Sequence, residues 1–319
     1  MDKQTFKSWY CKTRNCAQSS GVTSFYNIRR LRQMGGETKG TIPVNPKWVT
    51  EALLSKLDKS KVSTVAKKNM VASLVAYLKA AKGSKKIIAS ASGLMNKYAR
   101  DVQKHYTSQE KTDRQKTNWV DMKQVQDFWK EKTREVAAKK LYSKADWTPA
   151  QRRLAEQSLM LALHGGSGHP PPRLEMSSLV YTKDGQFEAN KNYLYQNKRG
   201  VWRARIARSK VTSKKGVMDI KFSSPVARVL NRMKKFLTFG RPVFQNKKGG
   251  PLTRSAYSKR LRALFAERFP GKRIGAGLLR VIFLSDMYKG MPELKLAEET
   301  AEQMMHNKST AVGKYVKKK

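Results

Sequence analysis

Two residue types that can take part in bond-breaking chemistry lie close together near the end of the sequence. His306 precedes Tyr315 by nine residues in the stretch MMHNKSTAVGKYVKKK. A phenol hydroxyl can act as a nucleophile and an imidazole as a proton acceptor. The alternative is a basic tail that carries one aromatic residue and binds something acidic. The pair alone does not decide between a reacting site and such a tail.

Three further places combine cationic side chains with an unusual sequence context. Arg173 follows three consecutive prolines, which stiffen the backbone before it. The same sequence is also compatible with an arginine that only stacks on the protein surface. Lys210, Lys214 and Lys215 lie in the stretch SKVTSKKG. Arg280 lies in the apolar run GAGLLRVIFLSDM. Burying a guanidinium costs much free energy unless its charge is paired or faces a cleft, so we expect a functional or paired role for Arg280.

The charge of the chain narrows the class of partner. It has 67 Lys and Arg residues against 23 Asp and Glu, a net charge of +44. A field of this sign attracts polyanions, so nucleic acid is the first expectation and an anionic membrane the second. The sequence has no apolar run near the roughly 20 residues of a membrane span, and neither common lipid signal. The N-terminal MDKQTFKSWY has no apolar signal-peptide core, which predicts an intracellular protein, neither secreted nor membrane-bound.

Cysteine usage gives no sign of a metal site. Cys11 and Cys16 are the only two cysteines, and the chain has four His residues. Two thiols do not form a disulfide framework, and a lone CxxxxC makes a poor zinc site. We expect reduced thiols and no structural metal.

The first part of the sequence predicts a basic arm, a helical domain and a linker. Residues 1–44 are polar and contain several glycines, so we expect an arm that is helical only at Ser24–Met34. Asn45-Pro46 is a helix-start signal, and the pattern from 45–106 is helical with lysines on its polar faces. That density of lysine favours a DNA-facing surface at least as much as a solvated one. TSQEKTDRQKT, residues 107–117, has almost no apolar residue and predicts the linker.

Residues 118–319 predict a second domain that is mostly helical. Thr148-Pro149-Ala150-Gln151 is a capping box with proline at the first helical position. VWRARIARSK and VMDIKF then alternate apolar and polar residues around VTSKKG, which predicts a β-hairpin with a basic tip. Ser224-Pro225 begins another helix. Further helices are expected at 253–268, 275–289 and 293–305. The predicted fold class is mainly α with a small antiparallel β-sheet, in two domains.

The order of five residues in this domain resembles the active site of the tyrosine recombinase (phage-integrase) family: Arg173, Lys210, Arg280, His306 and Tyr315. That family's last box has a Tyr nine residues after its His, and HNKSTAVGKY has the same spacing. The resemblance implies a two-domain DNA clamp, with a core-binding domain at 45–106 and a catalytic domain at 118–319. PPPRLE, SKVTSKKG and EKTDRQKTNWV look most like integrases of large DNA viruses, virophages and related mobile elements.

The resemblance also implies a role for each of the five residues. Arg173 and Arg280 would hold the non-bridging oxygens of a DNA phosphate, and Tyr315 would attack it to form a covalent 3′-phosphotyrosine. His306 would accept the phenol proton or hold a phosphate oxygen. Lys210 would protonate the leaving 5′-oxygen. No metal, nucleotide or other small-molecule cofactor is implied.

Two positions depart from the family pattern. Gly277 stands three residues before Arg280, where the family usually has His or Lys, and it has no side chain that could donate to a phosphate. A neighbour such as Lys272 or Arg273 could substitute, or the site could be slower. The acidic residue expected after the first Arg is also displaced, with Glu175 two positions on.

Double-stranded DNA is the expected partner, bound mainly through phosphate contacts that weaken steeply with salt. Candidate DNA-binding residues are Lys67, Lys68, Arg203, Arg205, Lys215, Arg254, Lys259 and Arg260. Lys214 could assist catalysis from the hairpin tip. The resemblance further implies a homodimer or tetramer on DNA, in a host nucleus or a viral replication compartment.

Three other interpretations stay open. A catalytically inactive relative could serve as a DNA-packaging or accessory DNA-binding protein, which Gly277 and the extreme charge favour. A type IB-like topoisomerase would share the chemistry. A histone-like basic protein would explain neither the apolar surroundings of Arg280 nor the spacing between His306 and Tyr315.

Overall fold

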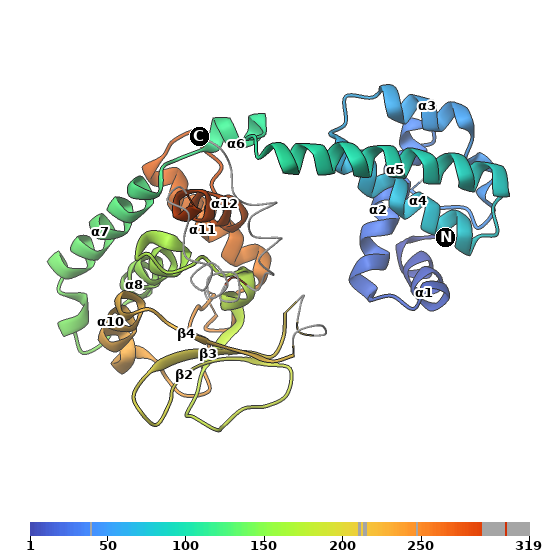
Figure 1. The fold of residues 1–319 in the computed structure, drawn as a ribbon. Coiled ribbons are helices and arrows are strands. Elements are labelled where there is room, and N and C mark those ends of the chain that lie inside the picture. The colour runs from blue at the N-terminus through green and yellow to red at the C-terminus, as the bar shows by residue number, and fades with distance from the viewer. Residues whose placement is uncertain (39, 210–211, 213–215, 247, 289–303, 305–319) are drawn as a thin grey trace. The chain divides into compact units, whose positions relative to one another are not determined.

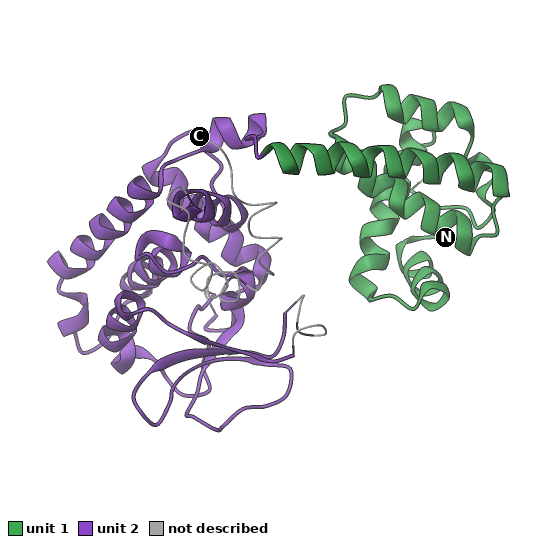
Figure 2. Ribbon diagram, in the orientation of Figure 1, with its two compact units in different colours: residues 1–108 green, residues 109–319 purple. Residues whose placement is uncertain are grey.

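The computed structural model describes residues 1–38, 40–209, 212, 216–246, 248–288 and 304 (Figure 1). The chain forms two compact units, residues 1–108 and 109–319 (Figure 2). Unit 1 is helical throughout, and unit 2 adds a small sheet to its helices. The predicted fold class, mainly α with a small sheet in two domains, is therefore confirmed. Within the described part of the chain, no helix has both the length and the apolar character of a membrane span.

Unit 1 surrounds one apolar core. Its helices are α1 (Lys3–Arg14), α2 (Gln18–Met34), α3 (Glu51–Lys59), α4 (Thr64–Ala80) and α5 (Lys85–Ser108), with the 3-10 turn η1 (Pro46–Trp48) before α3. Side-chain oxygens of Asp2, Thr50 and Ser63 accept hydrogen bonds from the first turns of α1, α3 and α4, which satisfies donors that have no partner inside a helix. Helix α4 runs through the core, because it is apolar over most of its surface.

The expected arm at 1–44 is instead part of this core. Phe6 on α1 is fully buried, and its ring centroid lies 6.3 Å from that of Tyr77 on α4. The helical domain is therefore larger than the expected 45–106. The helix expected at Ser24–Met34 matches the larger part of α2. The sequence pattern missed α1 because a few aromatic anchors among many polar residues stabilise it, and tertiary packing supplies most helix stability in proteins. Cys11 and Cys16 are free thiols here, and the Cys16 thiol donates to the Cys11 sulfur over 2.8 Å.

Much of the expected linker at 107–117 is also helical. Helix α5 continues to Ser108, and α6 (Asp113–Asn118) begins soon after it. Thr112 and Gln115 form a capping box at the start of α6, with the Gln115 Oε1 accepting from the Thr112 backbone over 2.9 Å. This polar segment is therefore ordered by its cap, and it belongs to unit 2.

The other helices that the structure describes in unit 2 pack around a second core. They are α7 (Met122–Ala138), α8 (Pro149–Leu161), α10 (Ser224–Met233), α11 (Arg254–Arg268) and α12 (Ala276–Met287), with the 3-10 turns η2 (Leu141–Ser143), η4 (Leu174–Ser178) and η5 (Lys234–Phe236) and the π-helical turn η3 (Ala162–Gly166). The helices expected at 253–268 and 275–289 match α11 and α12 closely. Of the helix expected at 293–305, only Met304 belongs to the described residues.

Among the described residues, the sheet of unit 2 has four strands in the order β1-β2-β3-β4. They are β1 (Leu179–Tyr181), β2 (Asn192–Gln196), β3 (Trp202–Ile206) and β4 (Met218–Lys221). Strands β3 and β4 form the predicted antiparallel pair, with Ala204 opposite Ile220. The sheet is not purely antiparallel as expected, because β1 and β2 run parallel. The sequence pattern missed β2 because four of its five residues are buried, which removes the alternation that marks a half-exposed strand.

Candidate active site

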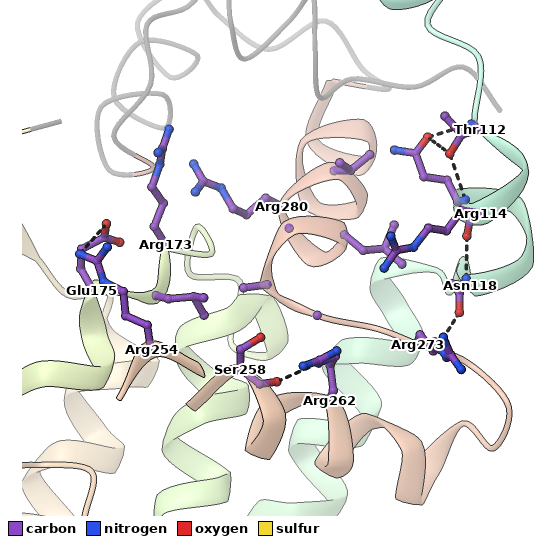
Figure 3. A pocket seen from close by; sticks show the side chains of 17 residues that line it. Thr112, Arg114, Asn118, Arg173, Glu175, Arg254, Ser258, Arg262, Arg273 and Arg280 are labelled. Carbon is purple, nitrogen blue, oxygen red and sulfur yellow. Dashed lines mark hydrogen bonds and ion pairs between the residues drawn. The ribbon is translucent and has the colours of Figure 1, made fainter. Parts of the chain in front are cut away.

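A pocket of about 770 Å³ surrounds the start of α12 in unit 2 (Figure 3). Its walls come from α6, η4, α11, α12 and the turn before α12. The charged residues that line it are Arg114, Arg173, Glu175, Arg254, Arg262, Arg273 and Arg280. Six guanidiniums against one carboxylate make the pocket strongly positive, so it is suited to bind an anion.

Arg173 reaches this pocket because a tight turn and a stiff lead precede it. The turn η3 ends α8 with Gly165 at φ +102°, a conformation that residues with a Cβ rarely adopt. A Cβ on Gly166 would lie only 2.5 Å from the Cβ of Trp129 on α7, so the turn packs directly against that helix. Three prolines then lead to Arg173, which is half-buried at the start of η4.

Arg280 lies on α12 with its side chain only 4% exposed. Its neighbours Leu279, Val281 and Ile282 are buried in the core. An arginine that snorkels would carry its charge to solvent, and Arg280 does not. Its Nη2 atom donates to the backbone carbonyl of Met304 over 2.5 Å. The side chains of Arg280 and Arg173 extend into the same part of the pocket (Figure 3).

The displaced acidic residue Glu175 lies beside this arginine pair. Its side chain is 3% exposed, and its Oε1 atom lies 3.6 Å from Nη2 of Arg254 on α11. Arg254, expected only as a DNA-binding residue, is half exposed and lines the pocket with Arg173 and Arg280. One buried carboxylate therefore orients one of the guanidiniums that face the pocket.

Gly277, at the position where a histidine or lysine was expected, faces open space. It is exposed on the first turn of α12, and a Cβ built on it would meet no atom within 4 Å. Of the two neighbours proposed to replace it, Lys272 donates to the carbonyls of Trp119 over 2.7 Å and Thr117 over 3.3 Å. Arg273 lines the pocket. The Lys272 ammonium is therefore engaged by backbone carbonyls, and Arg273 is the one of the two that lines the pocket.

Two histidines of unit 2, His164 and His169, are fully buried. Nε2 of His164 in η3 lies 3.2 Å from the Tyr257 hydroxyl on α11, which ties the two elements together. Burial, and next the positive charge of Arg280, lower the pKa of His164 to about 3. Burial lowers the pKa of His169 to about 4, and its ring packs against Phe222 at 5.6 Å. Both imidazoles are therefore neutral near pH 7 and add no positive charge to the interior of unit 2.

Five of the predicted site residues lie outside the described residues. They are Lys210, Lys214 and Lys215 at the hairpin tip, and His306 and Tyr315 near the C-terminus. Their roles stay predictions. The described residue nearest in sequence to His306 is Met304, which is buried against Leu284 of α12 and accepts the Arg280 hydrogen bond.

The DNA-binding candidates of unit 2 fall into two groups. Arg203 pairs with Asp219 over 2.9 Å, and the Arg205 guanidinium lies 4.8 Å from the Phe187 ring centroid. Arg260 pairs with the buried Glu156 over 2.5 Å, so its charge is engaged inside the unit. The second group consists of Lys259 and Arg254 on α11, whose side chains are exposed. Lys215 lies outside the described residues.

In unit 1 the two lysine candidates lie near the start of α4. Lys67 donates to the Asp58 carbonyl over 2.7 Å, and its ammonium lies 6.0 Å from the Tyr98 ring centroid. Lys68 is half-buried. These contacts leave the surface basic but hold Lys67 against the neighbouring helices.

Sequence reasoning missed two arginines of the pocket. Arg114 lies on α6, in the stretch expected to be a linker, and Arg262 lies on α11. The capping box of Thr112 and Gln115 was visible in the sequence and could have predicted α6. No comparable signal marks Arg262, because α11 carries many basic residues and only the fold shows which of them face the pocket.

Comparisons with known proteins add a distant structural likeness. No protein-family model matches the chain, and no curated protein matches it significantly. The solved structure of XerA recombinase aligns with a TM-score of 0.38 and 9% sequence identity, over 97% of this chain and 92% of that one. A likeness at this level does not establish membership of a family.

Proposed function

We propose that this protein is a site-specific DNA recombinase that cleaves and rejoins DNA through a covalent 3′-phosphotyrosine. The observation that carries the proposal is the placement of Arg173 and Arg280. These residues lie far apart in the sequence, just before η4 and on α12, and both line one strongly positive pocket (Figure 3). Two guanidiniums converging in this way suit a phosphodiester, whose two non-bridging oxygens gain negative charge in the transition state.

The proposed reaction exchanges one phosphoester bond for another. The Tyr315 oxygen forms a bond to phosphorus while the bond from phosphorus to the 5′-oxygen breaks. The phenol proton passes to His306, and Lys210 supplies a proton to the leaving 5′-oxygen. Because the phosphotyrosine is itself a phosphoester, the 5′-hydroxyl of a second DNA end can reverse the step without an external energy source.

The hydrogen bond between Arg280 and Met304 supports the assignment of the C-terminal residues. It brings Met304, the described residue closest in sequence to His306, into contact with an arginine of the pocket. The sequence then continues through His306 to Tyr315. A nucleophile must reach within about 3.5 Å of the phosphorus, so a chain segment that begins beside the arginine clamp is well suited to carry it.

The proposed substrate is double-stranded DNA, held mainly by phosphate contacts from both basic units. The protein acts as a homodimer or tetramer assembled on that DNA. Its biological role is the integration or resolution of a viral or mobile-element genome, a proposal that rests on the sequence stretches PPPRLE, SKVTSKKG and EKTDRQKTNWV.

A second candidate is a catalytically impaired relative that packages or organises DNA. Gly277 favours it, because the site lacks a side-chain donor at that position and nothing in the described chain fills the space. This candidate and the recombinase both predict DNA binding that weakens with salt. Only covalent chemistry separates them.

The deciding experiment offers the protein a nicked duplex that carries the terminal sequence of its own element. The nick lets the short 5′ product diffuse away and traps any covalent complex, which is then detected by denaturing gel. We expect a protein–DNA adduct whose digestion yields phosphotyrosine at residue 315. Tyr315→Phe should form none, whereas Tyr26→Phe, which changes an exposed tyrosine of unit 1, should match the wild type. An adduct from Tyr315→Phe, or none from the wild type on any cognate end, would overturn the proposal.

A further inference from the structure

We propose that Arg114, Arg262 and Arg273 form a second anion subsite of this pocket, which holds a neighbouring backbone phosphate of the DNA strand. The inference rests on the proposed function for its ligand, because DNA is the polyanion that the site would act upon. It adds residues on α6 and α11 to the binding surface and explains why the pocket extends past the Arg173 and Arg280 pair.

The shape of the pocket supports two subsites. Its volume of about 770 Å³ is far larger than one phosphate group, and lies in the range of pockets that hold whole ligands. Arg173, Arg254 and Arg280 lie on one side of the start of α12, and Arg114, Arg262 and Arg273 lie on the other (Figure 3). A strand that crosses the start of α12 would bring successive phosphates to the two groups.

The second group is held in place by hydrogen bonds between α6 and the turn before α12. The Asn118 side chain is buried, and its Nδ2 donates to the Arg114 carbonyl over 2.7 Å. Its Oδ1 accepts from the backbone N–H of Arg273. Lys272 adds its bonds to the carbonyls of Thr117 and Trp119. These contacts fix the backbones of Arg114 and Arg273 relative to each other, which lowers the entropy lost on binding.

Arg262 approaches the same place from α11. A Cβ on Gly275 would lie 3.5 Å from the Arg262 Cγ, so the aliphatic stem of Arg262 lies against the residue that precedes α12. The first backbone N–H groups of α12 have no partner inside the helix and point toward its start. Their partial positive charge adds to the guanidiniums at this side of the pocket.

The charges of the second group are available for a ligand. The three side chains are exposed, and the structure shows no ion pair from any of them to a described carboxylate. Glu175, the only carboxylate among the described residues that line the pocket, pairs with Arg254 of the first group. Three guanidiniums on one side of the pocket, with no ion pair to a described carboxylate, make that side positive and favour an anion there.

The test compares the full chain with Arg114→Gln, Arg262→Gln, Arg273→Gln and the triple variant. Binding to a short fluorescein-labelled duplex of mixed sequence is measured by anisotropy over a series of salt concentrations. Losing one phosphate contact should lower the slope of log affinity against log salt by about 0.9. We expect that change in the triple variant, smaller changes in the single variants, and recovery of the slope when the same residues are changed to Lys.

Arg134→Gln is the matched control, because Arg134 is an exposed arginine of unit 2 on α7 that does not line the pocket. It removes the same charge and should keep the wild-type slope. A triple variant that binds with the slope of the control overturns the subsite, as does weaker binding that Lys does not restore. The proposed function fails separately, since its test is adduct formation by the wild type and this test needs only reversible binding.

Discussion

The guanidinium of Arg280 donates to the backbone carbonyl of Met304 over 2.5 Å, and both residues are buried. This contact links α12, which presents the arginine to the pocket, with the part of the chain that leads toward His306 and Tyr315. A buried charge is tolerated only where hydrogen bonds or a ligand compensate it. Arg280 therefore has two kinds of contact: Nη2 donates to the Met304 backbone carbonyl, and the side chain lines an anion pocket.

Arg280→Lys should abolish most of the cleavage activity although it keeps the positive charge. A lysine ammonium cannot bind a phosphate with two parallel donors, and it cannot span the distance from α12 to both Met304 and the substrate. Removing one fixed donor to transition-state charge lowers rates by about 10²–10³, so adduct formation at saturating DNA should slow by at least that factor. Single-turnover trapping on the nicked duplex measures it.

Arg199→Lys is the control for that measurement, because Arg199 is an exposed arginine in the turn between β2 and β3 and does not line the pocket. The variant also leaves the buried Met304 carbonyl without its donor, which should lower the free energy of unfolding by roughly 1–3 kcal/mol. A thermal melt of Arg280→Lys measures this loss of stability separately from the loss of activity. Adduct formation at the wild-type rate by Arg280→Lys would show that Arg280 does not contact the scissile phosphate.

Gly277→His should speed adduct formation. The space beside Gly277 is open, so an imidazole fits there and adds the donor that the pocket lacks at this position. We expect an increase of about tenfold or more, since one well-placed donor to the developing charge has a large effect. Gly277→Ala adds a Cβ without a donor and should leave the rate unchanged, although a better helix former can stabilise α12 by up to about 1 kcal/mol. Equal rates for the His and Ala variants would mean that other groups already fill this role.

The stability of unit 2 should fall as the pH drops below about 6.5. In the unfolded chain His164 and His169 titrate near the ordinary value, whereas burial lowers their folded pKa values to about 3 and about 4. Above pH 6.5 both states are neutral and the free energy of unfolding is constant. Below it only the unfolded chain takes up protons, so stability is lost progressively until the pH reaches the folded pKa values. At pH 5 each histidine should cost roughly 2 kcal/mol.

Urea unfolding between about pH 7 and about pH 5 tests this, because carboxyl groups titrate mostly below that window. His169→Gln removes one of the two groups and should reduce the pH dependence by about half. His105→Gln changes a histidine of α5 in unit 1 and should leave the dependence as it is. If His169→Gln and the wild type lose stability in parallel, burial does not lower the pKa of His169.

The contrast between Arg280 and Arg114 shows what the sequence could predict. Arg280 interrupts an apolar helix, where burying a charge costs free energy unless the charge is paired or faces a cleft. The sequence alone therefore indicated that Arg280 has a role. Arg114 lies in a polar stretch where nothing distinguishes it from its neighbours. Only the hydrogen bonds of Asn118 and Lys272, which join α6 to the turn before α12, bring it to the pocket. Contacts between residues so far apart in the chain leave no periodic pattern.

The same reasoning explains the errors in the fold. Periodicity predicted α10, α11 and the β3–β4 hairpin, because each has one buried and one exposed face. Helix α12 was predicted from its apolar run, because it is buried on nearly all sides. Periodicity missed α1, whose anchors are scattered aromatics, and β2, whose side chains are buried on both faces. Where tertiary packing rather than amphipathic pattern stabilises an element, the sequence alone underestimates it.

Arg260 and Lys259 are adjacent on α11 and should respond to substitution in opposite ways. Arg260 is paired with Glu156, which is 2% exposed, and burial raises the pKa of Glu156 more than Arg260 lowers it. Arg260→Gln removes the partner of a buried carboxylate and should lower the free energy of unfolding by about 3–5 kcal/mol. Lys259→Gln changes an exposed side chain and should alter stability by no more than about 0.5 kcal/mol. Urea titration of both variants near pH 7 measures the difference.

A double variant separates the buried charge from the loss of packing. In Arg260→Gln with Glu156→Gln no carboxylate is left unpaired, so most of the lost stability should return, since neutral groups are far cheaper to bury. The two variants should affect DNA binding in the opposite order. Lys259→Gln should lower the salt slope of binding by about 0.9 if Lys259 contacts a phosphate, whereas the stable double variant should keep the wild-type slope. A double variant that loses slope as Lys259→Gln does would place Arg260 on the DNA-binding surface after all, with its pairing to Glu156 broken when DNA binds.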